Sequence, residues 1–335
     1  MNKNAFDTDL YIGLQLSQIK EKLKLSGEKF YIEIGGKLIQ DHHAARVLPG
    51  YREDARFEVV KKLSSLGDIV LVVSAKDILR GRIRGDFKIT YDKETLRTIR
   101  ELRNRGLSIG YVAVSLLDRS RDIPSEIIFF ENELKKEGVS VYRFFSSSNH
   151  QLSIFSANDL EINPYMRFSS RFIFVISPGG GSGKFGICLS QLYHEMKHGI
   201  SPRYFSLGAF PIYELPATHP LNLAYMAASA DFRDALKEDP NAANSLLTER
   251  EIENYNLLKQ ISEFFNKEGR YLREINSATD MCVSSLSKGI VDDEEVQREA
   301  AAEIARRYMR YKFEVERGQE GAEILEWVKN IFLKL

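Results

Sequence analysis

The chain has 335 residues, of which 43% are hydrophobic, enough for a folded core in one large domain or two smaller ones. Lysine plus arginine and aspartate plus glutamate both number 47, so the chain lacks the basic excess typical of proteins that bind nucleic acid or anionic membranes. The two cysteines are expected to be reduced thiols, and no apolar run approaches the roughly 20 residues of a membrane helix, so we expect a cytoplasmic protein without nucleic-acid or membrane partners.

The first half of the chain alternates helix-like segments with short apolar runs. Gly67, Gly106 and Gly138 follow the helix-like segments, where glycine accepts the left-handed conformation of a C-terminal cap. Apolar runs without alternation are typical of a parallel sheet covered on both faces, so the pattern predicts an α/β fold with a mostly parallel layered sheet. Strands are expected at 29–34, 69–73, 107–117, 139–144 and 172–176, and a later one at 205–213.

Two polar segments directly follow the first two expected strands. In the first, Gly35, Gly36 and Lys37 precede Asp41, His42, His43 and Arg46. We expect this segment to contact substrate, with Lys37, Asp41 or His43 assisting proton transfer, and a solvated loop is the alternative. The second segment offers arginines among glycines, which suit bidentate binding of carboxylate or phosphate, and a plain charged loop is again the alternative. Its candidate substrate-binding residues are Arg80, Arg82, Arg84 and Asp86.

A glycine-rich loop, 178–184, joins the expected strand at 172–176 to a helix. Glycines let consecutive backbone N–H groups turn onto one anion, the helix N-terminus adds a partial positive charge, and Lys184 adds a full one. Strand, glycine loop, lysine and helix in this order predict a P-loop-like phosphate site, most simply for ATP or another nucleotide. The predicted ligand-binding residues are Gly179, Gly180, Gly181, Ser182, Gly183 and Lys184, the last also with a catalytic role. The alternative is a tight turn with Lys184 in solvent.

The metal of this site is less well defined. Phe185 stands where the usual pattern has the serine or threonine that holds Mg²⁺. Mg²⁺ would therefore be held otherwise, with Ser182 or Asp231 as candidates, and the metal ligands stay unknown. The carboxyl ends of parallel strands share one edge of a sheet, where open α/β sheets bind their ligands. The three segments are expected to meet there.

A rival motif lies in the helix after the glycine loop. His194, Glu195 and His198 fit H-E-x-x-H, the pattern of zinc hydrolases. His194 is about eleven residues into that helix, and at about 1.5 Å per residue this places it about 16 Å from a phosphate at the loop. The two motifs cannot form one active site, and we prefer the phosphate loop.

The remainder of the chain has two distinct parts. Residues 146–170 are polar and irregular, as in a linker or a loop over the active face, whereas the chain beyond Pro220 is mostly helical. Thr248 and Glu251 form a capping box, and Asp292 and Asp293 are interpreted as a helix cap in preference to metal ligands. We divide the chain into an α/β domain, 1–235, and a mainly helical subdomain, 236–335, which is a candidate surface for homo-oligomers.

A set of motifs in fixed order resembles the bacterial family called domain of unknown function 1846, across nearly the whole chain. The resemblance implies a bacterial or phage-like source and a multi-domain α/β architecture, and it implies no reaction. The loop of that family also lacks serine or threonine after its lysine, and longer members carry a further C-terminal region, so this chain is similar to a shorter variant. The motifs are Gly35–Leu38, His43–Gly50, Ile83–Phe87, Ser177–Lys184, Leu189–Glu195, His219–Tyr225, Thr279–Met281 and Gly289–Asp293.

These observations predict a phosphate- or nucleotide-binding enzyme, an ATP-dependent phosphotransferase or ligase acting on a small anionic metabolite. The main alternative is a non-catalytic module that binds a nucleotide or phosphometabolite as a regulatory ligand. A phosphate-ester enzyme that needs no nucleoside, and a zinc hydrolase, are less favoured hypotheses.

Overall fold

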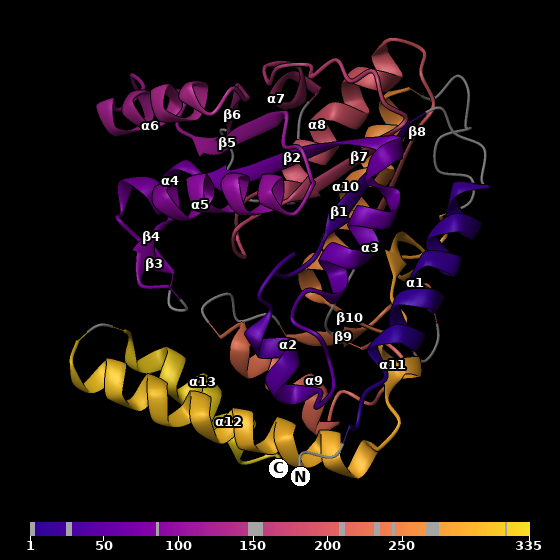
Figure 1. The fold of residues 1–335 in the computed structure, drawn as a ribbon, viewed down its shortest axis with the longest axis vertical. Coiled ribbons are helices and arrows are strands. Elements are labelled where there is room, and N and C mark those ends of the chain that lie inside the picture. Colours follow the sequence, from indigo (N-terminus) through magenta and orange to yellow (C-terminus); the bar gives the residue numbers. More distant parts are fainter. Residues whose placement is uncertain are drawn as a thin grey trace.

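A computed structural model describes residues 4–24, 29–84, 87–146, 157–207, 212–230, 235–242, 245–265, 275–318 and 320–335. Figure 1 shows a twisted central sheet flanked by helices. The strands are β1 Lys29–Ile34, β2 Gly67–Ser74, β3 Ile83–Arg84, β4 Ile89–Thr90, β5 Tyr111–Leu117, β6 Ser140–Phe145, β7 Phe172–Ile176, β8 Pro202–Leu207, β9 Leu236–Glu238, β10 Leu246–Thr248 and β11 Cys282–Val283. The helices are α1 Thr8–Leu23, α2 His42–Val47, α3 Ala55–Leu63, α4 Ala75–Leu79, α5 Tyr91–Asn104, α6 Ser125–Lys136, α7 Ala157–Glu161, α8 Lys184–Lys197, α9 Pro220–Ala228, α10 Glu249–Phe264, α11 Leu286–Gly289, α12 Asp293–Glu316 and α13 Ala322–Phe332.

The central sheet has seven strands in the order β11-β8-β1-β7-β2-β5-β6, and all its neighbouring pairs are parallel. Two small antiparallel pairs, β3-β4 and β9-β10, lie outside it. The predicted α/β class with a mostly parallel sheet is therefore confirmed. The glycine-loop strand β7 lies between β1 and β2, so strands that precede it in the chain surround it.

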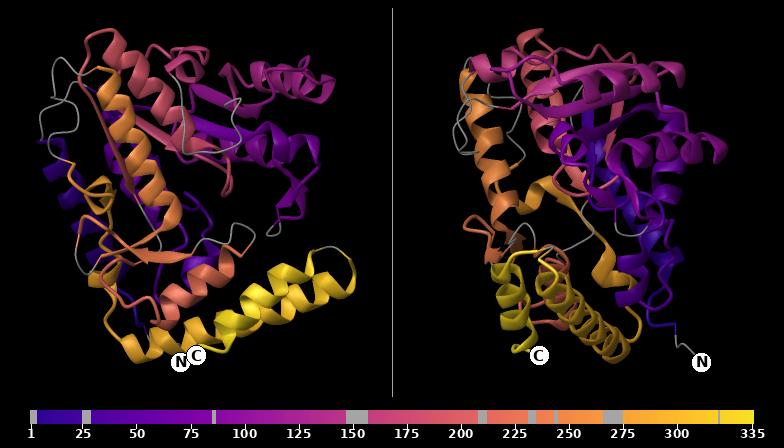
Figure 2. Two further views of the ribbon diagram at one scale, coloured as in Figure 1. Left: turned by 180° about the vertical axis from the view of Figure 1, so that it is seen from behind. Right: turned by 90° about the vertical axis from the view of Figure 1, so that its left-hand side faces the viewer.

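Helices cover both faces of the sheet, as the unbroken apolar runs predict. On β1 the side chains alternate, with Phe30 and Ile32 in one buried cluster and Tyr31 in the other. The first cluster includes apolar residues of α1, α3, α5 and α6, and the second those of α7, α8 and α10. Figure 2 shows α8 and α10 over the sheet in the view from behind. Every residue of β7 is buried, as a central parallel strand requires.

Two expected strands have different bounds. The run 107–117 becomes strand only from Tyr111, because the preceding residues end α5: Gly106 is left-handed and the Leu107 N–H donates to the Leu102 carbonyl. The run 205–213 is strand at Pro202–Leu207, and residues 208–211 lie outside the described part.

The C-terminal third combines helices with a strand of the main sheet. Figure 1 shows α12 below α2 and α9, with α13 alongside α12. The predicted caps are confirmed, since Thr248 and Glu251 form a capping box and Asp292 accepts from the Glu295 N–H at the start of α12. However, β11 pairs with β8, and α10 packs on α8, so residues 236–335 complete the sheet of the first segment as well as adding helices. The boundary at 235 stays a prediction.

Both cysteines are free thiols, and Cys188 is fully buried. Among the described residues, no helix combines the length and apolar character needed to cross a membrane.

Candidate functional site

The glycine loop leaves the sheet next to the Gly35–Lys37 segment. β7 pairs in parallel with β1, from which Gly35–Lys37 follows, and with β2, which leads into α4 and Arg80. The predicted segments therefore emerge at one edge of the sheet, as expected for carboxyl ends of parallel strands.

Three glycines of the loop have backbone conformations or close contacts that favour glycine. Gly181 and Gly183 have φ angles of +71° and +81°, in the left-handed region that favours glycine, and Gly183 is the N-cap of α8. A Cβ atom at Gly179 would lie 2.5 Å from the hydroxyl oxygen of Tyr91, so the first glycine is required by close approach. The Ser115 hydroxyl of β5 donates to the Ser182 carbonyl at 2.5 Å, which ties the loop to the sheet.

Lys184 points inward. Its side chain is 9% exposed, and its Nζ donates to the Ser177 hydroxyl at 3.2 Å and lies 3.7 Å from Oε1 of Glu33. Tyr204 on β8 donates to the other oxygen of Glu33 at 2.9 Å. This arrangement differs from the alternative of a turn with Lys184 in solvent.

Glu33 was not among the candidates from sequence. It occupies the penultimate position of β1 within a run of apolar residues, so its only sequence signal is a lone acidic residue in a buried strand. Buried carboxylates are rare unless paired, and that rule could have identified it.

Ser182 carries a buried hydroxyl that has no hydrogen-bond partner among the described residues. The residue as a whole is only 4% exposed. Buried hydroxyls usually have a partner, supplied by protein, water or a bound group.

The arginine segment reaches the glycine loop through Tyr91. The Arg82 guanidinium lies 5.6 Å from the centre of the Tyr91 ring, and its Nη1 donates to Asp77 at 3.2 Å. Because Tyr91 also borders Gly179, Arg82 lies on the same side of the sheet edge as the loop. Arg80 is exposed at the end of α4, whereas the Arg84 side chain and Asp86 lie outside the described part, as does Asp231.

Asp41 holds the Gly35–Lys37 segment in place. It accepts from the Ala44 N–H at the start of α2 and forms a buried ion pair with Arg56, at 2.6 Å. Burial alone would raise the pKa of Asp41, but the charges of Arg56 and His43 and the Ala44 N–H hydrogen bond together outweigh it, so that pKa is lowered. Arg56 Nη1 also donates to the Lys37 carbonyl at 3.1 Å, and a Cβ atom at Gly36 would lie 2.4 Å from this nitrogen. Gly36 is therefore needed for packing over Arg56.

The neighbouring histidines contact carboxylates. His42 Nδ1 lies 2.7 Å from Glu53, and His43 Nδ1 lies 3.3 Å from the buried Glu303 of α12. Burial lowers the pKa of His43, which favours its neutral form. The proton-transfer roles expected for Asp41 and His43 stay predictions, and both residues have structural contacts.

The H-E-x-x-H residues are engaged in packing. Glu195 is fully buried and accepts from the hydroxyls of Tyr31 and Tyr165, each at 2.8 Å, with Lys29 Nζ at 3.1 Å. His194 Nε2 lies 2.7 Å from the Asn163 carbonyl oxygen. Across the described ranges, no three His, Cys, Asp or Glu side chains are grouped so as to hold a metal ion.

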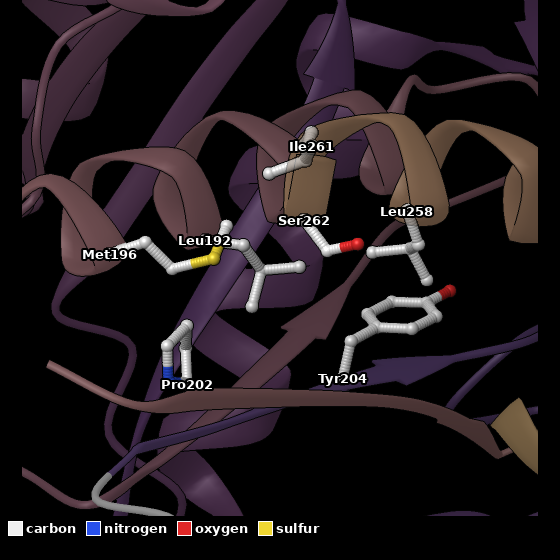
Figure 3. Close-up of a pocket in the computed structure, with 7 residues that line it drawn as sticks. All are labelled: Leu192, Met196, Pro202, Tyr204, Leu258, Ile261 and Ser262. Atoms are coloured by element: carbon white, nitrogen blue, oxygen red, sulfur yellow. The ribbon is translucent and has the colours of Figure 1, made fainter. Parts of the chain in front are cut away.

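A small cavity lies beside α8, away from the glycine loop. It has a volume of about 20 Å³ and is lined by α8, α10 and β8, with Met196, Tyr204 and Leu258 among its walls. Figure 3 shows that these side chains are almost entirely apolar. The volume admits about one water molecule, so this cavity is no nucleotide site.

The chain belongs to the family described as domain of unknown function DUF1846, N-terminal, whose model matches residues 4–335. It is 38% identical over 342 residues to a UPF0371 protein of Clostridium tetani (strain Massachusetts / E88), covering 99% of this chain and 66% of that protein. A UPF0371 protein of Fusobacterium nucleatum subsp. nucleatum is 37% identical over 330 residues, covering 96% of this chain and 63% of that protein. The chain thus spans somewhat under two thirds of the length of these relatives, and the family resemblance is confirmed.

Proposed function

We propose that the loop 178–184 binds the phosphates of ATP or another nucleotide, and that the protein is an ATP-dependent phosphotransferase or ligase for a small anionic metabolite. One observation carries the proposal. Lys184, 9% exposed, is held at the base of a loop with left-handed Gly181 and Gly183, at the carboxyl edge of a parallel sheet. A tight turn alone has no need of a buried lysine.

In the proposed site, the backbone N–H groups and the Lys184 ammonium have different roles. Backbone N–H groups of Gly179–Gly183 and the start of α8 would receive phosphate oxygens, and Lys184 would neutralise them. The Ser182 hydroxyl, buried without a protein partner in the described part of the chain, would donate to the same group.

Glu33 would bind Mg²⁺ in place of the serine or threonine that the usual pattern has after the lysine, where this chain has Phe185. Mg²⁺ prefers oxygen ligands, and in nucleotide sites it is usually bound by one or two carboxylates together with oxygens of the substrate phosphates. Glu33 is at the end of β1, the strand next to the loop strand, where a carboxylate can face a phosphate-bound cation. Arg82, 39% exposed and in contact with Tyr91 beside the loop, would bind the anionic substrate, together with Arg80 and Lys37.

The second candidate is a regulatory module that binds the ligand without turnover. It is favoured by the contacts of Asp41 and His43, the expected proton carriers, which pair with Arg56 and Glu303 and hold α2 in place. Homo-oligomers through the helical region and a cytoplasmic location, where ATP is available, belong to the proposal as well.

A thermal-shift panel tests the proposal. Wild type and Lys184→Ala would be compared with ATP, GTP, NAD, coenzyme A, sugar phosphates and pyrophosphate, with and without Mg²⁺. A nucleotide-specific shift that disappears in Lys184→Ala is expected. ATP consumption in the presence of anionic metabolites then separates the enzyme from the regulatory module. Failure of every phosphate compound to shift the wild type would overturn both.

A further inference from the structure

A second group of cationic side chains lies between α2 and α12, with a buried carboxylate at its centre. Glu303 on α12 is 2% exposed and accepts from Nε and Nη2 of Arg46, at 2.9 and 3.1 Å. Arg306 and Arg307, one turn along α12, donate to the same carboxylate through Nε at 2.9 and 3.0 Å. Three guanidiniums therefore converge on one carboxylate.

The charges in this cluster do not balance. Three arginines face one glutamate, an excess of two positive charges. His43, the fourth group at this carboxylate, has a pKa lowered by burial, which favours the neutral imidazole, so it adds no charge to the cluster. Asp41 lies nearby but is paired with Arg56, and Glu299 on α12 lies near Arg298.

Arg306 and Arg307 also have N–H groups that do not donate to Glu303. Arg306 and Arg307 use only Nε, so within the described ranges their Nη groups have no acceptor. The Arg306 and Arg46 side chains are 49% and 40% exposed, and Arg307 is 15% exposed, so a solute can reach them. Because Glu303 fixes each guanidinium at Nε, the remaining N–H groups are oriented before any ligand arrives.

We propose that Arg46, Arg306 and Arg307 form a binding site for a phosphate group that carries two negative charges. The dianion would neutralise the excess charge and accept from the unused guanidinium N–H groups, whose fork geometry matches phosphate oxygens. The cluster contains no residue of the glycine loop, so phosphate binds here whether or not that loop binds a nucleotide.

A calorimetric titration in a Lys184→Ala background isolates this second site. Inorganic phosphate and glycerol phosphate would be titrated separately at constant ionic strength, because exposed charges are screened by salt. One protein carries Arg306→Gln and Arg307→Gln in addition. The matched control carries Arg298→Gln and Arg310→Gln, which remove two arginines of the same helix that pair with Glu295 and Glu314.

Saturable binding of inorganic phosphate or glycerol phosphate is expected, at least tenfold weaker in the Arg306 and Arg307 variant and unchanged in the control. Tighter binding of glycerol phosphate identifies a phosphate monoester as the ligand, and equal binding identifies the phosphate group alone. Equal affinity in all three proteins, or no saturable binding, would overturn the proposal. If the glutamine variant does not fold, Arg306→Lys with Arg307→Lys keeps the charges without the fork, and severalfold weaker binding is expected; unchanged binding contradicts the proposal.

Discussion

The Nζ atom of Lys184 lies 3.7 Å from Oε1 of Glu33, where the first residue of α8 meets the end of β1. Both side chains are mostly buried, and Tyr204 holds the second oxygen of the same carboxylate. If the loop binds phosphate as proposed, the phosphate shares Lys184 with Glu33 unless a cation joins the carboxylate. The proposal therefore predicts that phosphate binding depends on Mg²⁺.

Replacement of Glu33 by glutamine tests that dependence. The change removes a negative charge but keeps an acceptor for Tyr204. Without Mg²⁺, pyrophosphate should bind several-fold to about tenfold more tightly than to the wild type, because like-charge repulsion is gone. Added Mg²⁺ should then improve affinity less than it does in the wild type. Calorimetry in EDTA and in Mg²⁺ measures both effects. Glu58→Gln, on α3, is the control, and identical behaviour of the two variants would refute the role of Glu33.

The left-handed turn before α8 gives a second prediction. Gly183→Ala forces a side chain into a φ of +81° and places its Cβ 3.4 Å from Ser115, so it should destabilise the fold by about 1–2 kcal/mol. Gly186→Ala, three residues along in α8, meets nothing within 4 Å and should stabilise the helix by about 0.5–1 kcal/mol. Urea unfolding measures the two free energies. A Gly183→Ala variant as stable as the wild type would mean that Gly183 is not required by its backbone conformation.

Glu195 gives a third prediction, which separates packing from zinc chemistry. Glu195→Ala leaves Lys29 and two tyrosine hydroxyls without their buried acceptor, so a loss of about 3 kcal/mol in unfolding free energy is expected. Glu161→Ala, which breaks an exposed pair with Lys197 of α8, should cost less than about 1 kcal/mol. Zinc measured in the purified protein should not change with His194→Ala. A stoichiometric zinc ion that this variant removes would support the hydrolase instead.

Local sequence signals account for the fold class but not for the order of the strands in the sheet. Unbroken apolar runs with glycine caps were sufficient to predict the α/β class and the main strands, since these signals are local. The two-residue strand β11 is too short for any pattern, and only its pairing with β8 places it in the sheet. The insertion of β7 between β1 and β2 is likewise set by tertiary packing.

The candidate site divides in a similar way. The sequence predicts a strand before the loop 178–184 and a helix after it, and β7 and α8 are present there. Phosphate binding by the loop stays a prediction. Glu33 was missed because its pairing with Lys184 depends on strand order, which the sequence does not show. Glu303, the partner of His43, lies on a helix far along the chain and was missed for the same reason.

The α2–α12 contact predicts acid sensitivity. Burial alone would raise the pKa of Glu303, but hydrogen bonds from His43 and Arg46 and the charge of Arg307 together outweigh it and hold that pKa well below its ordinary 4.5. A carboxylate with a depressed folded pKa stabilises the protein above its unfolded pKa, and this stabilisation is lost as pH falls below about 4.5. The lowered pKa of His43 acts in the same direction, starting below its ordinary value of 6.5.

Urea unfolding at several pH values between about 7.5 and about 3.5 checks this contribution. Glu303→Gln should be less stable than the wild type near neutral pH and should lose less stability on acidification. Glu299→Gln, on the same helix and 33% exposed, should follow the wild type. Parallel pH curves for all three proteins would contradict a role for Glu303.

The most direct test of the central claim is a calorimetric titration of pyrophosphate with Mg²⁺ into the wild type, Lys184→Ala and Lys197→Ala. The two lysines begin and end α8, and Lys197 lies in an exposed pair. Loss of a buried charge-assisted contact predicts at least tenfold weaker binding in Lys184→Ala, with Lys197→Ala equal to the wild type. Equal affinity in all three folded proteins would show that the loop 178–184 is not the phosphate site.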